Sequence, residues 1–183
     1  MGGMRDGPQD STSISRYDRA TGTTETVAAA WRTPPVVTGS RGDAVMLSLP
    51  RMVPNDDWAV GADGRIAVVR ANGYFVEWHM SDGTVVSGPE TPYEVHSIAY
   101  EDKEADLEES SGAGLAVMIS RSTSGEARMQ MSRGGFGGGG DQPTVEDQEW
   151  GDEFPPFRQR RSRVTPFNEV WVQRWLPVDR EPM

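Results

Sequence analysis

Between residues 57 and 88, the pattern of apolar and polar positions predicts four short β-strands. Apolar residues recur on alternating positions around Trp58, Val68 and Trp78, and a fourth run follows at 84–87. Asp63-Gly64 separates the first two runs and Ser81-Asp82-Gly83 separates the last two, and such pairs indicate hairpin turns because their residues tolerate positive φ. Four antiparallel strands joined by hairpins are one blade of a β-propeller, so we predict a complete blade at 57–88.

Incomplete copies of this pattern lie on both sides of that blade. Residues 13–18 and 23–28, with a turn at 19–22, match the third and fourth strands of a blade, and residues 163–175 match the first two strands. In the second copy, Phe167-Asn168 lies near the position of Asp63-Gly64. A repeat of roughly 40 residues is typical of propellers and solenoids. We therefore predict an all-β fold: a partial β-propeller with one complete four-stranded antiparallel blade, two half-blades and a largely irregular insertion.

Three segments carry a resemblance to a known family. Residues 56–78, 88–94 and 169–175 resemble uncharacterised, predicted exported bacterial proteins of the six-bladed β-propeller type, which includes the TolB, NHL and YncE groups. The resemblance implies a propeller fold and a location in the periplasm or cell envelope. It implies no catalytic residue, because the shared segments are strand and hairpin patterns.

The predicted organisation has three parts. Residues 1–100 form propeller blades, with a half-blade at 11–30 and the full blade at 57–88; residues 101–162 form an insertion; and residues 163–183 begin the next blade. Within the insertion, 101–112 is acidic and helix-prone, and 114–131 suits either a strand pair or a short helix. Residues 133–141 are rich in glycine and predict a flexible loop. We expect most of this acidic, glycine-rich and arginine-rich insertion to be flexible.

The length bears on the number of blades. A closed six-bladed ring needs about 250 residues or more, and this chain has 183. It begins without the pattern of a signal peptide and ends just after a strand pair. We therefore expect a fragment whose remaining blades come from a longer parent chain or from another copy, since the open strand edges of half-blades would otherwise promote aggregation.

Charge limits the class of partner. The formal net charge of -10 argues against nucleic acid, because a nucleic-acid-binding protein neutralises phosphates with a basic surface. Arg158, Arg160, Arg161 and Arg163 form a local exception. They are either a solvated loop that balances the acidic stretch 146–153, or a docking site for an acidic partner or a lipid head group. No apolar run is long enough to span a membrane.

The side chains available for catalysis are few. The chain has no cysteine, which excludes disulfides, thiolate nucleophiles and thiolate metal sites. His79 and His96 are the two histidines, and neither lies in a metal-binding motif; we interpret His79 as a structural residue of the third strand. No G-x-S-x-G sequence marks a nucleophile. These observations favour a protein that is not an enzyme.

Asp56 and Asp57 are the best candidates for a metal site. They follow Asn55 at the entry to the first strand of the blade, where a propeller lines its central channel, and clustered oxygen donors suit Ca²⁺. The alternative is an ordinary turn in which these side chains accept backbone hydrogen bonds. Some six-bladed relatives hold Ca²⁺ at the axis and hydrolyse lactones. Two functions therefore remain: a non-catalytic binding or scaffold propeller for a peptide, glycan or protein, or part of a metal-dependent lactonase-like hydrolase or lyase with Asp56 or Asp57 as ligand or base.

Large aromatic residues lie in the predicted strands. We expect them to fill the space between neighbouring sheets, where each would bury about 150 to 250 Å². On this interpretation Trp171→Ala costs about 3 to 5 kcal/mol. The set is Trp58, Tyr74, Trp78, Phe167, Trp171 and Trp175.

Overall fold

The computed structural model describes residues 10–41, 44–111, 115–121, 127–133 and 144–177. The described chain is mostly β-strand, arranged in small antiparallel sheets, with one α-helix. It divides into two compact units, each assembled from three stretches of sequence. The first unit comprises Met1–Thr33, Val53–Val95 and Phe154–Trp175, and the second comprises Pro34–Met52, His96–Glu153 and Leu176–Met183. Each unit is described separately.

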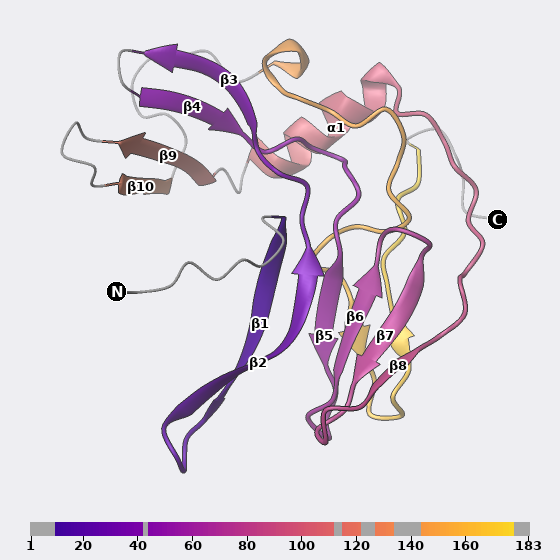
Figure 1. Cartoon of the computed structure of the whole chain (residues 1–183). Helices are drawn as coiled ribbons and strands as arrows, with labels where there is room; N and C mark the ends of the chain where they lie inside the picture. The colour runs from indigo at the N-terminus through magenta and orange to yellow at the C-terminus, as the bar shows by residue number, and fades with distance from the viewer. Residues whose placement is uncertain (1–9, 42–43, 112–114, 122–126, 134–143, 178–183) are drawn as a thin grey trace. The chain divides into compact units, whose positions relative to one another are not determined.

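A four-stranded antiparallel sheet is the centre of the first unit. Its strands follow one another in chain order, as Figure 1 shows. This confirms the four strands predicted within 57–88. The strands are β5 (Asp57–Val60), β6 (Ile66–Arg70), β7 (Phe75–His79) and β8 (Val85–Ser87).

Aspartate and glycine determine the turns of this sheet. Between β5 and β6, the Gly61 N–H donates to the Arg65 carbonyl at 2.9 Å, and the Gly64 N–H donates to the Gly61 carbonyl at 3.0 Å. Gly64 has a φ of 84°, a conformation that costs a residue with a Cβ about 1 to 2 kcal/mol. The turn between β7 and β8 has the same pattern, with Met80, Gly83 and Thr84 in the equivalent places.

A long hairpin packs against one face of the sheet. It is formed by β1 (Ser11–Asp18) and β2 (Thr23–Trp31), which pair antiparallel with a bulge after Ile14. The hairpin contains the strands predicted at 13–18 and 23–28 and extends beyond them. Its apolar side chains meet two apolar residues of β6 in a buried cluster, which consists of Ile14, Ala28, Ala30, Ile66 and Val68, with Val27 packed against it.

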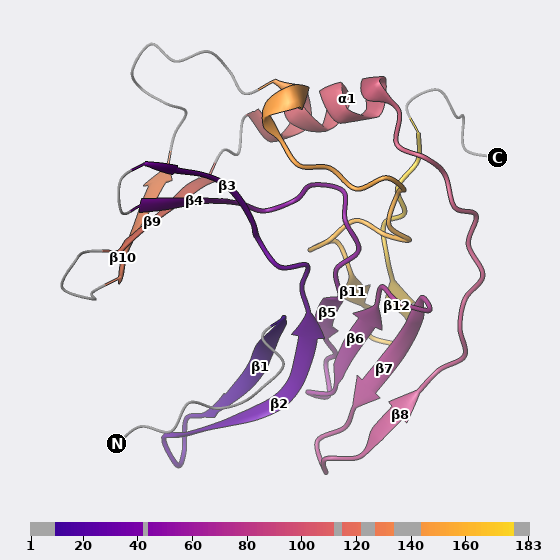
Figure 2. The same cartoon turned by 45° about the horizontal axis from the view of Figure 1, so that its top comes forward.

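A short strand pair packs against the opposite face. It is formed by β11 (Arg163–Val164) and β12 (Val170–Trp171), within the stretch where two strands were predicted. The first unit therefore contains three successive β layers, and Figure 2 labels the strands of all three. The cluster between the sheet and this pair contains Val69, Ala71 and Phe157, with Tyr74, Val76, Val170 and Val172 packed against it.

The β11–β12 pair repeats the local geometry of β5–β6. The Thr165 N–H donates to the Glu169 carbonyl at 2.9 Å, and the Asn168 N–H donates to the Thr165 carbonyl at 3.0 Å. Asn168 has a φ of 63° and therefore takes the place of Gly64. Val164 pairs with Val170 as Val60 pairs with Ile66. The repeat predicted from the sequence is thus present in the backbone of these two hairpins.

The second unit combines two hairpins with the helix. The hairpins are β3 (Val36–Arg41) with β4 (Ala44–Ser48), and β9 (Leu115–Arg121) with β10 (Ala127–Arg133). The helix α1 spans Tyr100–Ser111, which confirms a helix within the stretch 101–112. Of the two alternatives for 114–131, the described residues form the strand pair β9 and β10. The sequence analysis did not anticipate β3 and β4. Of the glycine-rich stretch 133–141, all but Arg133 lies outside the described residues.

One arginine links the elements of the second unit. Arg51 Nε donates to Asp106 Oδ2 of α1 at 2.7 Å, and its Nη2 donates to Ser110 Oγ at 2.6 Å. The guanidinium also lies 5.4 Å from the ring centroid of Trp150, which follows the short 3-10 helix η1 (Val145–Asp147). These contacts hold α1 and the segment around Trp150 next to Arg51.

Candidate functional site

Asp56 joins two layers of the first unit through hydrogen bonds. Its side chain is buried, and Oδ2 accepts hydrogen bonds from the Trp31 N–H at 2.9 Å and from Arg70 Nη1 at 2.7 Å. Its Oδ1 accepts a hydrogen bond from the Ala71 N–H at 3.0 Å. The carboxylate therefore connects the end of β2 to the end of β6.

Asp57 has a different set of partners from its neighbour. It is the first residue of β5 and is 2 % exposed, and its Oδ2 accepts hydrogen bonds from the N–H groups of Arg161 at 3.1 Å and Ser162 at 3.0 Å. One buried carboxylate thus holds two successive amides of the segment that precedes β11. The sequence could not have shown this contact, because it joins residues about 100 positions apart.

The contacts of Asn55, Asp56 and Asp57 favour the turn interpretation over the metal site. Asn55 Oδ1 accepts a hydrogen bond from the Thr33 N–H at 2.6 Å, so N–H donors face all three side chains. Calcium needs several converging oxygen ligands, and the guanidinium of Arg70 beside Asp56 would repel a cation. Within the described residues, no group of three or more histidine, aspartate or glutamate side chains is placed to hold a metal ion. The donors around these carboxylates do not fit Ca²⁺.

A second polar cluster extends from Asp56 across the strands β6 and β7. Arg70 Nη2 lies 2.5 Å from Glu77 Oε1, and that same oxygen lies 2.7 Å from His79 Nε2. Burial raises the pKa of Glu77, but hydrogen bonds from Arg70 and His79 outweigh this effect, so its pKa lies below the ordinary 4.5. The sequence analysis missed this cluster, although Glu77 and His79 are two residues apart on one strand and therefore share a face. The pairing agrees with a structural role for His79.

The predicted arginine cluster lies on an anchored turn. Arg160, Arg161 and Arg163 are exposed, while the half-buried Arg158 stacks its guanidinium 4.1 Å from the ring centroid of Trp175. Arg160 has a φ of 58°, an unfavourable conformation for a long side chain that persists where surrounding contacts enforce it. The two amides that follow Arg160 are those held by Asp57. We call residues 158–163 the arginine turn. The buried Asp57 carboxylate holds the backbone of this turn in the conformation described for Arg160.

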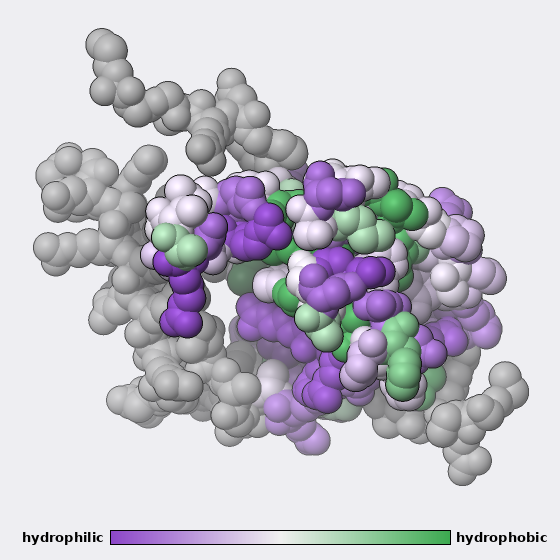
Figure 3. All heavy atoms as spheres, turned by 90° about the horizontal axis from the view of Figure 1, so that it is seen from below, coloured by the Kyte–Doolittle hydropathy of each residue, from purple (hydrophilic) through white to green (hydrophobic). Residues whose placement is uncertain are grey.

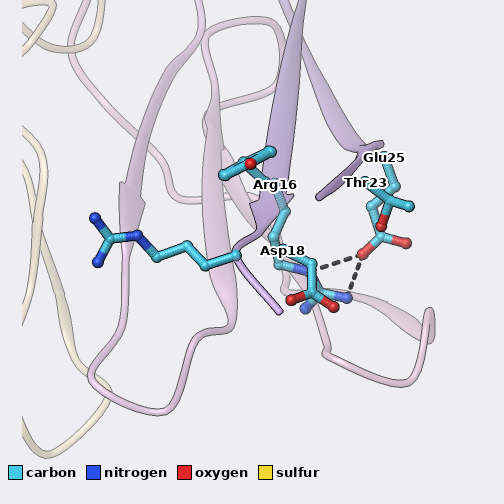
Figure 4. Close-up of a pocket in the computed structure, with 6 residues that line it drawn as sticks. Arg16, Asp18, Thr23 and Glu25 are labelled. Carbon is cyan, nitrogen blue, oxygen red and sulfur yellow. Dashed lines mark hydrogen bonds and ion pairs between the residues drawn. The ribbon is translucent and has the colours of Figure 1, made fainter. Parts of the chain in front are cut away.

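A shallow pocket lies at the far end of the β1–β2 hairpin (Figure 4). Arg16 Nε donates to Glu25 Oε1 across it at 2.7 Å. The Ala20 N–H donates to Asp18 Oδ1 at 2.8 Å, which lowers the pKa of this exposed carboxyl. All six lining residues come from the hairpin and its turn, and Arg16 and Glu25 already pair with each other, so the pocket offers no convergent set of groups for catalysis. The lining residues are Arg16, Tyr17, Asp18, Arg19, Thr23 and Glu25.

The expectation that the strand aromatics all fill the core is wrong for three of them. Trp171 is 66 % exposed, Phe167 is 85 % exposed and Trp58 is 40 % exposed. Tyr74 does pack between layers, with its ring centroid 5.8 Å from that of Phe157. Trp171 is exposed because its neighbours Val170 and Val172, which alternate with it, point to the buried side.

No family model matches the sequence, and no characterised protein or solved structure is significantly similar to it. The helix among the described residues is neither long nor apolar enough to span a membrane.

Proposed function

We propose that this chain is a non-catalytic binding or scaffold protein of the β-propeller type, resembling the TolB, NHL and YncE groups, and that it binds an acidic partner through the arginine turn. From the same resemblance we propose a location in the periplasm or cell envelope. The observation that carries the proposal is the contact of buried Asp57 with the amides of Arg161 and Ser162.

Repetition supports the propeller part of the proposal. In the first unit, successive β layers pack face to face, and two of the hairpins share one turn geometry. Val170 and Val172 contact the neighbouring layer from the positions that Ile66 and Val68 occupy in the four-stranded sheet. Layers related in this way are typical of propeller blades.

Exposure and charge support the binding part. The stretch 154–175 contains five arginines and one glutamate, in a chain with a net charge of -10. Arginine binds carboxylates with paired, geometrically specific hydrogen bonds. Because Asp57 already holds the backbone of the arginine turn, less conformational entropy is lost on binding. The positive charge of the exposed residues Arg160, Arg161 and Arg163 suits an aspartate-rich or glutamate-rich segment of another protein.

Fluorescence anisotropy with a labelled glutamate-rich peptide tests this function on the full chain. We expect binding that weakens as salt rises, and a loss of at least tenfold in affinity when Arg160, Arg161 and Arg163 are all changed to glutamine. The matched control changes Arg16 and Arg19 to glutamine, because these arginines are also exposed and lie in the β1–β2 hairpin. An equal loss in the control would show non-specific charge attraction and refute the proposal. Binding to vesicles with anionic lipid, without binding to the peptide, would refute the acidic protein as partner.

The alternative function is a metal-dependent lactonase-like hydrolase or lyase. It requires Asp56 or Asp57 to exchange its hydrogen bonds for a metal ion, and no contact in the described site favours that exchange. A calcium-dependent rise in melting temperature that disappears in both Asp56→Ala and Asp57→Ala would support the enzyme instead.

A further inference from the structure

The outer face of the β11–β12 pair is exposed, although the same face of the four-stranded sheet is covered. Each layer of the first unit has two faces, and a neighbouring hairpin packs against each face of the four-stranded sheet at β6, where Ile66 and Val68 are buried on one face and Val69 on the other. Ala67 of β6 is fully buried. By the repeat of the hairpins, Trp171 occupies the place of Ala67, and it is 66 % exposed.

This outer face has the composition of a protein interface. Arg163 pairs directly across from Trp171, and Phe167 in the adjoining turn is 85 % exposed. Tryptophan and arginine are the residues most often found at the energetic centres of interfaces. On the face of the molecule shown in Figure 3, hydrophobic side chains are scattered among hydrophilic ones.

The chain also contains a face that complements this one in size. Strands β1 and β2 bury Ile14, Ala28 and Ala30 on their inner face. The pairs Ser13 with Ala29 and Ser11 with Trp31 alternate with those residues and so belong to the outer face. Ser11, Ser13 and Ala29 have small side chains and leave space for a large aromatic from another layer, beside Trp31, which is 40 % exposed.

We infer that the outer face of β11–β12 in one copy binds the outer face of β1–β2 in a second copy. The second copy then covers Trp171 as β11–β12 covers the four-stranded sheet, which continues the stack of layers across the contact. The contact is heterologous, because each copy uses a different face, so it generates a ring or an open chain of copies. This inference goes beyond the proposed function and depends on Trp171 and Ser13, not on Arg160 or Arg161.

Two variants of the full chain, each with one face blocked, test this contact. Trp171→Glu places a charge on the β11–β12 face, and Ser13→Arg places a large charged group on the β1–β2 face; both sites are exposed, so both variants should fold. By light scattering over a concentration series, the unmodified chain should increase in mass with concentration, whereas each variant alone should stay monomeric. An equimolar mixture of the variants should form a one-to-one dimer, because each supplies the face that the other lacks.

The control is Val85→Glu, which adds the same charge at a half-exposed position in β8 and should associate like the unmodified chain. At a concentration low enough to keep every chain monomeric, circular dichroism must show the same melting temperature for the variants as for the unmodified chain. A monomeric unmodified chain at every concentration would overturn the inference. So would a mixture that remains monomeric while the unmodified chain associates, because that result indicates a contact between identical faces.

Discussion

Asp56→Ala should destabilise the first unit, because three hydrogen-bond donors share this buried carboxylate. The substitution removes three hydrogen bonds and leaves the N–H groups of Trp31 and Ala71 without their acceptor. Removing one partner of a buried ion pair costs about 3 to 5 kcal/mol. Arg70 is 23 % exposed and keeps Glu77 as a second partner, so we expect a value near the lower limit, about 3 kcal/mol.

Urea unfolding followed by tryptophan fluorescence measures this change. A loss of about 3 kcal/mol corresponds to a fall of about 1 to 3 M in the urea midpoint, with an unchanged slope. Asp82→Ala is the matched control, because exposed Asp82 accepts a single backbone hydrogen bond at 2.9 Å, from Thr84. We expect that control to lose no more than about 1 kcal/mol.

A loss of less than about 1 kcal/mol in Asp56→Ala would refute the reasoning, because the buried amides would then not depend on this carboxylate. Repeating the titration with Ca²⁺ and with a chelator separates the two interpretations of Asp56. The hydrogen-bonded turn predicts the same midpoint in both solutions.

The remaining predictions concern other positions of the first unit. Asp57→Ala should cost about 2 to 4 kcal/mol in urea unfolding. It should also weaken binding of the glutamate-rich peptide, although every arginine remains. Unchanged binding would show that the Asp57 carboxylate does not position the arginines for the peptide. Gly64→Ala should cost about 1 to 2 kcal/mol through its positive φ alone, since a Cβ there meets no neighbouring atom. Asn168→Gly, at the equivalent position with positive φ, should be neutral or slightly stabilising. Equal losses of stability in the two variants would contradict the shared turn geometry. Because the folded pKa of Glu77 lies below 4.5, its contribution is fully present above pH 4.5 and is lost as the pH falls through the folded value, so Glu77→Gln should flatten the acid side of a stability-against-pH curve. Trp171→Ala should change the stability of the monomer by less than about 0.5 kcal/mol, in contrast to the 3 to 5 kcal/mol expected for a core residue, and a large loss would show that this side chain is buried.

Some features of this protein could be predicted because they depend on neighbours in the chain. Asp63-Gly64 and Asp82-Gly83 indicate the turns between β5 and β6 and between β7 and β8, since glycine accepts the positive φ that each turn requires. The sequence of α1 also indicated the helix, because helix propensity depends on residues that are neighbours in the chain. The β3–β4 hairpin also has a local signal that was overlooked: Arg41-Gly42-Asp43 lies between Val36-Val37 and the alternating apolar residues that follow.

The candidate site depended on contacts that no local pattern contains. Asp56 and Asp57 are adjacent carboxylates in the sequence, and the sequence suggested that they act together on a metal. In the folded chain, Asp56 accepts hydrogen bonds from Trp31 and Arg70, whereas Asp57 accepts them from Arg161 and Ser162. Which donors reach them is decided by the packing of distant strands.

The strand β12 shows the same difference between what the sequence determines and what tertiary structure decides. Alternation by itself determined that Trp171 and its neighbours Val170 and Val172 face opposite sides, because successive side chains on a strand always do. Tertiary structure alone decided which side is buried, since burial depends on whether another layer lies there. The Val69 and Phe157 cluster covers the valine side, and Trp171 remains 66 % exposed.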